Sequence, residues 1–461
     1  MSYNPFIFSR TGGCLKAFFL FLCFALSGSG SYAQTANDYF KSGTEKISKN
    51  DTAGAIADLS KAIESDPAHI AAYYYYRALM RSGSIDTAGA MVDYNMAIAL
   101  DSTQSAAYYY RGFLKHNGQL YAAAIADYSK AILLDSNDAE VYCKRGRAKR
   151  QLGDYSGSLS DLNKAIIKVP KYGDAYSELG WTHYTLKNYR EALADFDSAV
   201  EMKQANQKVL MSRGQVKYSL ADYAGAERDF DRAIELKANY DTLYLDRGNT
   251  RFALSDTAGA YADFEKAIAL DPKYAQAYTG RGNVKDKMGD PAGAIADYNK
   301  AIELYPGDAT AHYNKGLTEY RTAHYRDALA DYEKSIELDT FYEHSAQTYY
   351  NMGMCSGQLK DFKNALLYLN SAIKTKGEDA DYIHSRATIK CLMHDYKAAV
   401  PDFDVVIKLN PKNARAYFER AIAKHYIKDI KGSELDFKKA AQLDTTYKEK
   451  YDKLTDKHAG K

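Results

Sequence analysis

The residue types that most often bind metals are present in this chain, but not at metal-binding spacing. Each of three Asp-x-Asp pairs lacks the glycine turn and the distal glutamate that a calcium loop requires. The ten histidines form no His-Glu-x-x-His motif and no helical pair at ligand spacing. We therefore expect no metal and no cofactor. The three pairs are Asp195/Asp197, Asp229/Asp231 and Asp402/Asp404.

Catalytic motifs are also missing. The sequence contains no phosphate-binding glycine loop, nucleophile elbow or dinucleotide fingerprint, and Gly280-Arg281-Gly282 falls in a helical pattern rather than after a strand. Cys143, Cys355 and Cys391 are too scattered for a disulfide framework, and we expect them to be packed in helices. These absences predict a protein that is not an enzyme.

Opposite charges recur at one fixed distance. In nine places a basic residue is followed, sixteen residues later, by an aspartate. Such a series fits either a charged ladder for a ligand or a salt bridge between two helices. Met352 and Tyr368 replace both charges together, which favours the salt bridge. The nine pairs are Arg77/Asp93, Arg111/Asp127, Arg145/Asp161, Arg213/Asp229, Arg247/Asp263, Arg281/Asp297, Lys315/Asp331, Arg386/Asp402 and Arg420/Asp436.

The charges follow a longer repeat. A small residue recurs every 34 residues, with steps of 35 after Gly43 and of 37 after Gly316, so the chain holds twelve repeats. A second small residue follows twelve positions later and a large apolar residue four beyond that, which indicates paired helices in close contact. The first positions are 43, 78, 112, 146, 180, 214, 248, 282, 316, 353, 387 and 421.

Helix starts are marked by capping residues. Asp or Asn stands four positions before the second small residue in ten repeats, where its side chain can cap a helix. Three of these begin an Asp-Thr-Ala triplet, which also fits an O-glycosylation signal of some Gram-negative bacteria. Both interpretations stay open. The ten residues are Asp51, Asp86, Asp154, Asn188, Asp222, Asp256, Asp290, Asp361, Asp395 and Asp429.

The run from Tyr278 to Pro306 resembles the tetratricopeptide consensus, and the resemblance extends over about residues 36–445. It implies an all-α, right-handed superhelical solenoid of about twelve helix-turn-helix repeats, with a concave groove. We expect an insertion near 341–347. Residues 446–461 carry Tyr447, Tyr451 and Leu454 at helical spacing and are expected to form a C-terminal capping helix and tail.

The same resemblance implies which residues bind a partner. In this family, ligands meet the first helix of a repeat six and three positions before its small residue, and one, four and five after it. Trp181, the only tryptophan, is the expected anchor, with packing between first helices as the alternative. The family's carboxylate clamp is not matched. The expected groove residues are Tyr109, Phe113, His116, Arg147, Arg150, Trp181, Tyr184, Met211 and Tyr218, with a second group of Tyr313, Tyr320, Arg321 and Tyr350.

The N-terminus has the layout of a secretory signal. Arg10 and Lys16 precede an apolar run, and small residues lead to Ala33, which predicts a signal peptide over residues 1–33. A membrane anchor is the alternative, but it needs about 20 apolar residues, roughly twice this run. Of 61 basic residues, 59 remain after residue 33 and balance 59 acidic ones, which argues against nucleic-acid binding.

Together these features predict a periplasmic or extracellular scaffold that binds a protein or an extended peptide in its groove. The alternative is a structural spacer or assembly subunit of an envelope or secretion complex that uses its convex face or its ends. The sequence names neither the partner nor the oligomeric state.

Overall fold

The computed structural model describes residues 31–66, 70–84, 86–203, 205–339 and 345–449, where every regular element is helical. The chain divides into two compact units, residues 1–220 (unit 1) and 221–461 (unit 2). Most of the expected signal peptide, residues 1–30, lies outside the described residues, as do 340–344 of the expected insertion and 450–461 of the tail.

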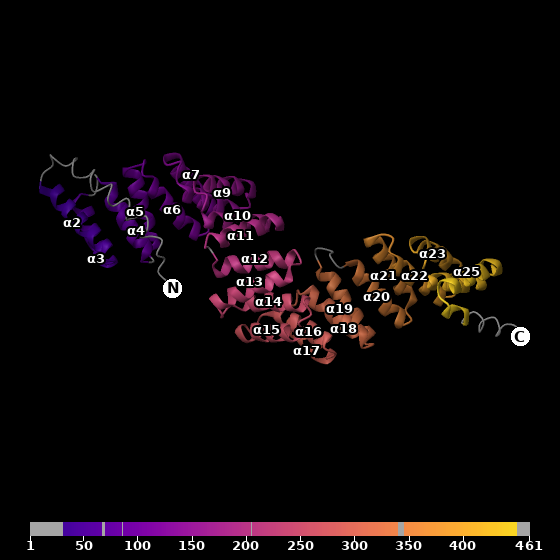
Figure 1. Cartoon of the computed structure of the whole chain (residues 1–461). Helices are drawn as coiled ribbons and strands as arrows, with labels where there is room; N and C mark the ends of the chain where they lie inside the picture. Colours follow the sequence, from indigo (N-terminus) through magenta and orange to yellow (C-terminus); the bar gives the residue numbers. More distant parts are fainter. Residues whose placement is uncertain (1–30, 67–69, 85, 204, 340–344, 450–461) are drawn as a thin grey trace. The chain divides into compact units, whose positions relative to one another are not determined.

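Unit 1 is a series of helices of 13 to 18 residues that succeed one another along the chain (Figure 1). They are α2 (Ser31–Ser48), α3 (Thr52–Ser65), α4 (Ala71–Gly83), α5 (Thr87–Leu100), α6 (Ser105–Asn117), α7 (Tyr121–Leu134), α8 (Ala139–Gln151), α9 (Tyr155–Lys168), α10 (Gly173–Thr185), α11 (Tyr189–Glu201) and α12 (Gln207–Ser219).

Unit 2 continues the same alternation of first and second helices. It contains α13 (Tyr223–Leu236), α14 (Asp241–Ala253), α15 (Thr257–Leu270), α16 (Ala275–Lys287), α17 (Pro291–Leu304), α18 (Ala309–Arg321), α19 (Tyr325–Leu338), α20 (Ser345–Gln358), α21 (Phe362–Lys376), α22 (Ala380–Leu392), α23 (Tyr396–Leu409), α24 (Ala414–Tyr426) and α25 (Ile430–Leu443).

The small residues lie where the two helices of a repeat touch. A Cβ atom added at Gly282 of α16 would lie 2.6 Å from Cε1 of Tyr298 in α17, closer than packed atoms approach. The second small residue is buried in every repeat, from Ala55 to Ser433, and so is the large apolar residue that follows it, as in Phe196 and Phe264. The predicted lattice of small and large residues is therefore confirmed.

The predicted helix caps are confirmed in nine of ten repeats. Asp290, for example, accepts a hydrogen bond from the Gly293 amide at 2.9 Å, and Pro291 begins the helix. The prediction for Asn188 is wrong, because its side chain makes no capping bond to α11. The nine capping residues are Asp51, Asp86, Asp154, Asp222, Asp256, Asp290, Asp361, Asp395 and Asp429.

The C-terminal end of the described chain packs against the last repeat. Residues 446–449 form a helical turn, and the Tyr447 ring lies 4.8 Å from that of Phe418 in α24.

No helix among the described residues is long and apolar enough to cross a lipid bilayer.

Candidate functional site

The predicted charge pairs form salt bridges between the two helices of a repeat. Eight of the nine predicted pairs form within the units, with N···O distances of 2.6–2.8 Å. The aspartates are almost fully buried. Because the salt bridges bury their charges, these side chains are not free to bind a ligand. The members of the ninth pair, Arg213 and Asp229, belong to different units, and that pair stays a prediction.

The arginines also reach the preceding repeat. Nη1 of Arg247 bonds Asp231 at 2.7 Å, and Nη1 of Arg420 bonds Asp404 at 2.7 Å. Arg213 bonds Asp197 in the same way at 2.8 Å. The second aspartate of each Asp-x-Asp pair is thus a partner for the next repeat's arginine. No group of three metal-binding side chains occurs in the described ranges.

Unit 1 brings most of the first predicted group together on its first helices. We call this the Trp181 surface; it comprises Phe113 and His116 of α6, Arg147 and Arg150 of α8, Trp181 of α10 and Lys208 of α12.

Trp181 lies between cations from both neighbouring repeats. The Lys208 ammonium is 4.1 Å from the centre of the indole, and the Arg150 guanidinium is 6.0 Å from it. The indole N–H donates to the Ser212 hydroxyl at 2.8 Å, and the ring packs edge-on against Phe196. The side chain is half-buried. It therefore packs between the first helices and also keeps part of its surface exposed.

Both arginines of the surface share one carboxylate. Nη2 of Arg150 donates to Glu178 at 3.0 Å, whereas Nε of Arg147 lies 3.4 Å from the other oxygen of Glu178. Glu178 is buried, but the Arg147 side chain is 41% exposed. Arg147 is therefore the cation of this pair that a partner can reach.

His116 lies beside the same cations. Burial, followed by the charges of Arg147, Lys144 and Arg150, lowers the pKa of His116 to about 4. The imidazole is therefore neutral near pH 7.

The remaining residues of the first group occupy different depths. Tyr109 is buried, and its hydroxyl donates to Glu140, so it belongs to the packed interior rather than to an open groove. Tyr184 is half-buried next to Tyr189, whereas Tyr218 is 38% exposed. Met211 is half-buried on α12.

The second group lies in unit 2 on α18 and α20. Tyr313 packs 5.8 Å from Tyr332, and Tyr320 packs 5.5 Å from Tyr325. Arg321 is exposed and forms an ion pair with Asp286. These residues are tied to their own and neighbouring repeats, and they belong to unit 2, whereas the Trp181 surface belongs to unit 1.

Comparison with known proteins identifies the repeats. Family models described as tetratricopeptide repeat match residues 143–209, 275–308, 309–342 and 346–379, and a model described as TPR repeat matches 248–289. The matched repeats are tetratricopeptide repeats. No curated protein sequence matches the chain significantly.

Several solved structures resemble the tetratricopeptide-repeat chain in fold. YrrB, titled a TPR protein with an unusual peptide-binding site, is 23% identical over 40% of this chain and 92% of its own, with a TM-score of 0.37. The Cut9–Hcn1 hetero-tetramer of APC/C is 13% identical over 90% and 94%, with a TM-score of 0.42. PilF of Pseudomonas aeruginosa is 20% identical over 46% and 97%, with a TM-score of 0.41.

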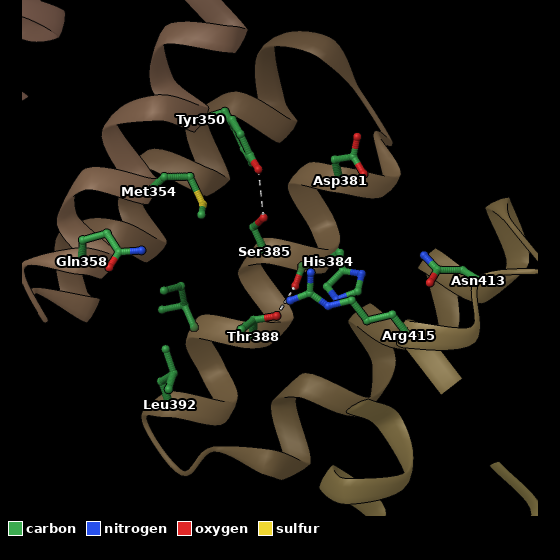
Figure 2. Close-up of a pocket in the computed structure, with 12 residues that line it drawn as sticks. Tyr350, Met354, Gln358, Asp381, His384, Ser385, Thr388, Leu392, Asn413 and Arg415 are labelled. Carbon is green, nitrogen blue, oxygen red and sulfur yellow. Dashed lines mark hydrogen bonds between the residues drawn. The ribbon is translucent and has the colours of Figure 1, made fainter. Parts of the chain in front are cut away.

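Unit 2 also forms a pocket that the sequence analysis did not predict. Its volume is about 420 Å³, and it lies between the first helices α20, α22 and α24. Figure 2 shows Tyr350 facing Ser385, whose hydroxyl donates to it at 3.4 Å. Met354 and Leu392 add apolar surface.

The carboxylate of Glu419 holds three polar residues that line this pocket in place. Glu419 accepts hydrogen bonds from Arg415 at 2.7 Å and from Thr388 at 3.1 Å, and it pairs with His384 at 2.9 Å. Burial raises the pKa of Glu419, but the bonds from His384 and Arg415 outweigh it and hold the pKa below its usual range. Tyr350 is the only pocket residue that sequence reasoning had singled out.

Sequence reasoning also missed Lys208 of the Trp181 surface and Glu178, the buried carboxylate that its arginines share. Lys208 stands six positions before Gly214, which is a groove position of the tetratricopeptide repeat, so the pattern itself could have identified it. Glu178 stands two positions before Gly180, at no groove position. Only the structure shows that it joins two arginines.

Proposed function

We propose that the chain is a non-enzymatic scaffold that binds a protein or an extended peptide outside the cytoplasm, through the surface formed by its first helices. Tetratricopeptide-repeat proteins are protein- and peptide-binding scaffolds, which supports this proposal. The signal-peptide layout of residues 1–33 supports export.

One observation carries the choice of binding surface. Trp181 is half-exposed between Arg150 and Lys208, so three successive repeats contribute aromatic and cationic side chains to one place. Tryptophan, tyrosine and arginine dominate the binding energy of protein interfaces. The Arg–Asp pairs, in contrast, neutralise each other inside the repeats, as Arg145 and Asp161 do.

A display selection tests this function. A random peptide library is panned on the wild-type protein, and enriched peptides are measured against Trp181→Ala and Trp181→Phe. We expect peptides to be enriched, to lose about tenfold or more in affinity for Trp181→Ala, and to be partly retained by Trp181→Phe. Circular dichroism controls for helicity. Failure to enrich any peptide, or equal affinity for all three proteins, contradicts the proposal.

A structural spacer remains the second candidate because the second helices expose apolar side chains. Leu133 of α7 is 76% exposed and Ile167 of α9 is 78% exposed, one repeat apart in sequence. Such residues favour contact with another protein surface. If this role is correct, Leu133→Ser with Ile167→Ser abolishes assembly with the partner while leaving peptide binding by the Trp181 surface unchanged.

A further inference from the structure

Charge separates along the first helices of unit 1. Glu140 and Asp174 lie in the first turns of α8 and α10, whereas Arg150 lies in the last turn of α8. Ten residues of helix place Glu140 and Arg150 about 15 Å apart along the axis. Glu140 is also bonded to the Tyr109 hydroxyl. The C-terminal half of α8 is therefore its positive half.

Around Trp181 the cations outnumber the carboxylates. Glu178 is the carboxylate that Arg147 and Arg150 share, and Lys208 adds a third positive charge over Trp181. One carboxylate thus faces three cations, which leaves an excess of positive charge next to the only tryptophan. An anionic group placed here gains attraction from all three cations.

The same place holds buried polar atoms without a hydrogen-bond partner. Nε of Arg147, Nε of Arg150 and Nδ1 of His116 are buried and have no hydrogen-bond partner among the described residues. Arg147 keeps only its 3.4 Å ion pair with Glu178. Buried donors without acceptors are costly, and a carboxylate can accept two parallel bonds from one guanidinium.

The cover over the indole is movable. The Lys208 side chain is exposed overall, but partial burial of its ammonium lowers its pKa; Glu178 opposes this shift, and Arg147 and Arg150 add to it. A carboxylate between these cations relieves their mutual repulsion. The flexible Lys208 side chain can then turn from the indole to the ligand, so that Trp181 reports the event.

We propose that the Trp181 surface binds side-chain carboxylates of an acidic peptide segment, with Arg147 as the principal contact. This inference rests on the proposed function and names the partner's chemistry. Because the recognised groups are side chains, binding does not require a free C-terminal carboxylate.

The test uses peptides with amidated C-termini and the full mature chain. Octaglutamate, octaglutamine and octalysine are titrated while the fluorescence of Trp181 is followed. We expect saturable binding of octaglutamate alone, weaker at high salt. Arg147→Gln is expected to weaken it about tenfold. The matched control is Arg190→Gln, which removes an exposed arginine from α11 and is expected to change affinity less than twofold.

Three results overturn the inference. Octaglutamine that binds as tightly as octaglutamate removes the carboxylate site. So does an affinity of Arg147→Gln for octaglutamate that equals that of Arg190→Gln. Equal binding of a single-stranded oligonucleotide shows an unspecific polyanion surface instead. The display selection distinguishes this inference from the proposed function. If the enriched peptides require Trp181 but are not acidic, peptide binding is supported and only the carboxylate inference is wrong.

Discussion

Arg247 and Asp263 form a two-pronged ion pair between α14 and α15, with Nε and Nη2 donating to the two carboxylate oxygens at 2.9 and 2.6 Å. The remaining Nη1 donates to Asp231 of the preceding repeat at 2.7 Å. Burial disfavours the charge, but the bonds to Asp263 and Asp231 outweigh it and raise the pKa of Arg247. One side chain thereby ties three helices together.

This arrangement predicts strong coupling in a double-mutant cycle. Arg247→Met is expected to destabilise the protein by about 2–4 kcal/mol, because it leaves Asp263 buried with one cation fewer. Combined with Asp263→Asn, the loss is expected to be smaller than the sum by about 1–3 kcal/mol. Urea unfolding measures the four proteins. Lys300→Met with Glu303→Gln is the exposed control, and strictly additive losses at Arg247 and Asp263 contradict the pairing.

The turns between paired helices predict a stabilising substitution. Ala323 has φ +62° where the equivalent Gly289 has φ +81°. A residue with a side chain loses about 1–2 kcal/mol of stability in this left-handed region. Replacing it with glycine removes that strain, but the greater freedom of glycine in the unfolded chain offsets part of the gain. Ala323→Gly is expected to stabilise by about 0.5–1 kcal/mol and Gly289→Ala to destabilise by a similar amount. Thermal unfolding of both variants measures these changes. A destabilised Ala323→Gly or a stabilised Gly289→Ala would contradict backbone strain at these turns.

Glu319 predicts a pH-dependent stability. Burial, with Lys315 opposing and Asp331 reinforcing it, raises the pKa of Glu319 from 4.5 to about 7. The folded state therefore holds a proton that the unfolded state loses, so this contribution is full below pH 4.5 and is lost as pH rises through about 7.

Glu319→Gln keeps the shape and removes the titration. We expect the variant to gain about 1–3 kcal/mol relative to wild type between pH 5 and pH 8. Chemical denaturation at several pH values measures the gain. Glu337→Gln, at a 68% exposed side chain, is the control and should show no such trend. A pH-independent difference for Glu319→Gln is incompatible with the raised pKa.

His116 reports the electrostatics of the Trp181 surface. Its imidazole is expected to titrate near the pKa of about 4 that burial and Arg147, Lys144 and Arg150 produce. Arg147→Gln should raise this pKa, because one of those charges is removed. Since the folded pKa lies below the unfolded one of 6.5, this group's contribution to stability falls as pH drops from 6.5 towards 4. NMR titration measures it; an unchanged pKa in the variant places Arg147 elsewhere.

The sequence predicted the fold well because each inference recurs along the chain, with twelve small-residue positions, ten predicted caps and nine charge pairs. The small residues, the caps and the Arg–Asp pairs recur in phase, so the close contact at Gly282 and the cap at Asp290 could be read directly. Asn188 failed because a capping residue type in the right place does not fix its side-chain rotamer.

The site was harder to predict because it depends on contacts between repeats. A groove pattern locates Arg147 and Trp181 but cannot show that Glu178 joins Arg147 to Arg150, or that Tyr109 is buried. The pocket near Tyr350 needs three helices in register, which a one-dimensional pattern does not describe.

Fluorescence of Trp181 tests the central claim most directly, since it is the chain's only tryptophan. Peptides enriched from the display library are titrated into the protein, with calorimetry confirming that binding occurs. The account predicts a saturable change in Trp181 emission with the same dissociation constant that calorimetry gives. Calorimetric binding with no change in Trp181 emission would contradict it and place the binding surface elsewhere.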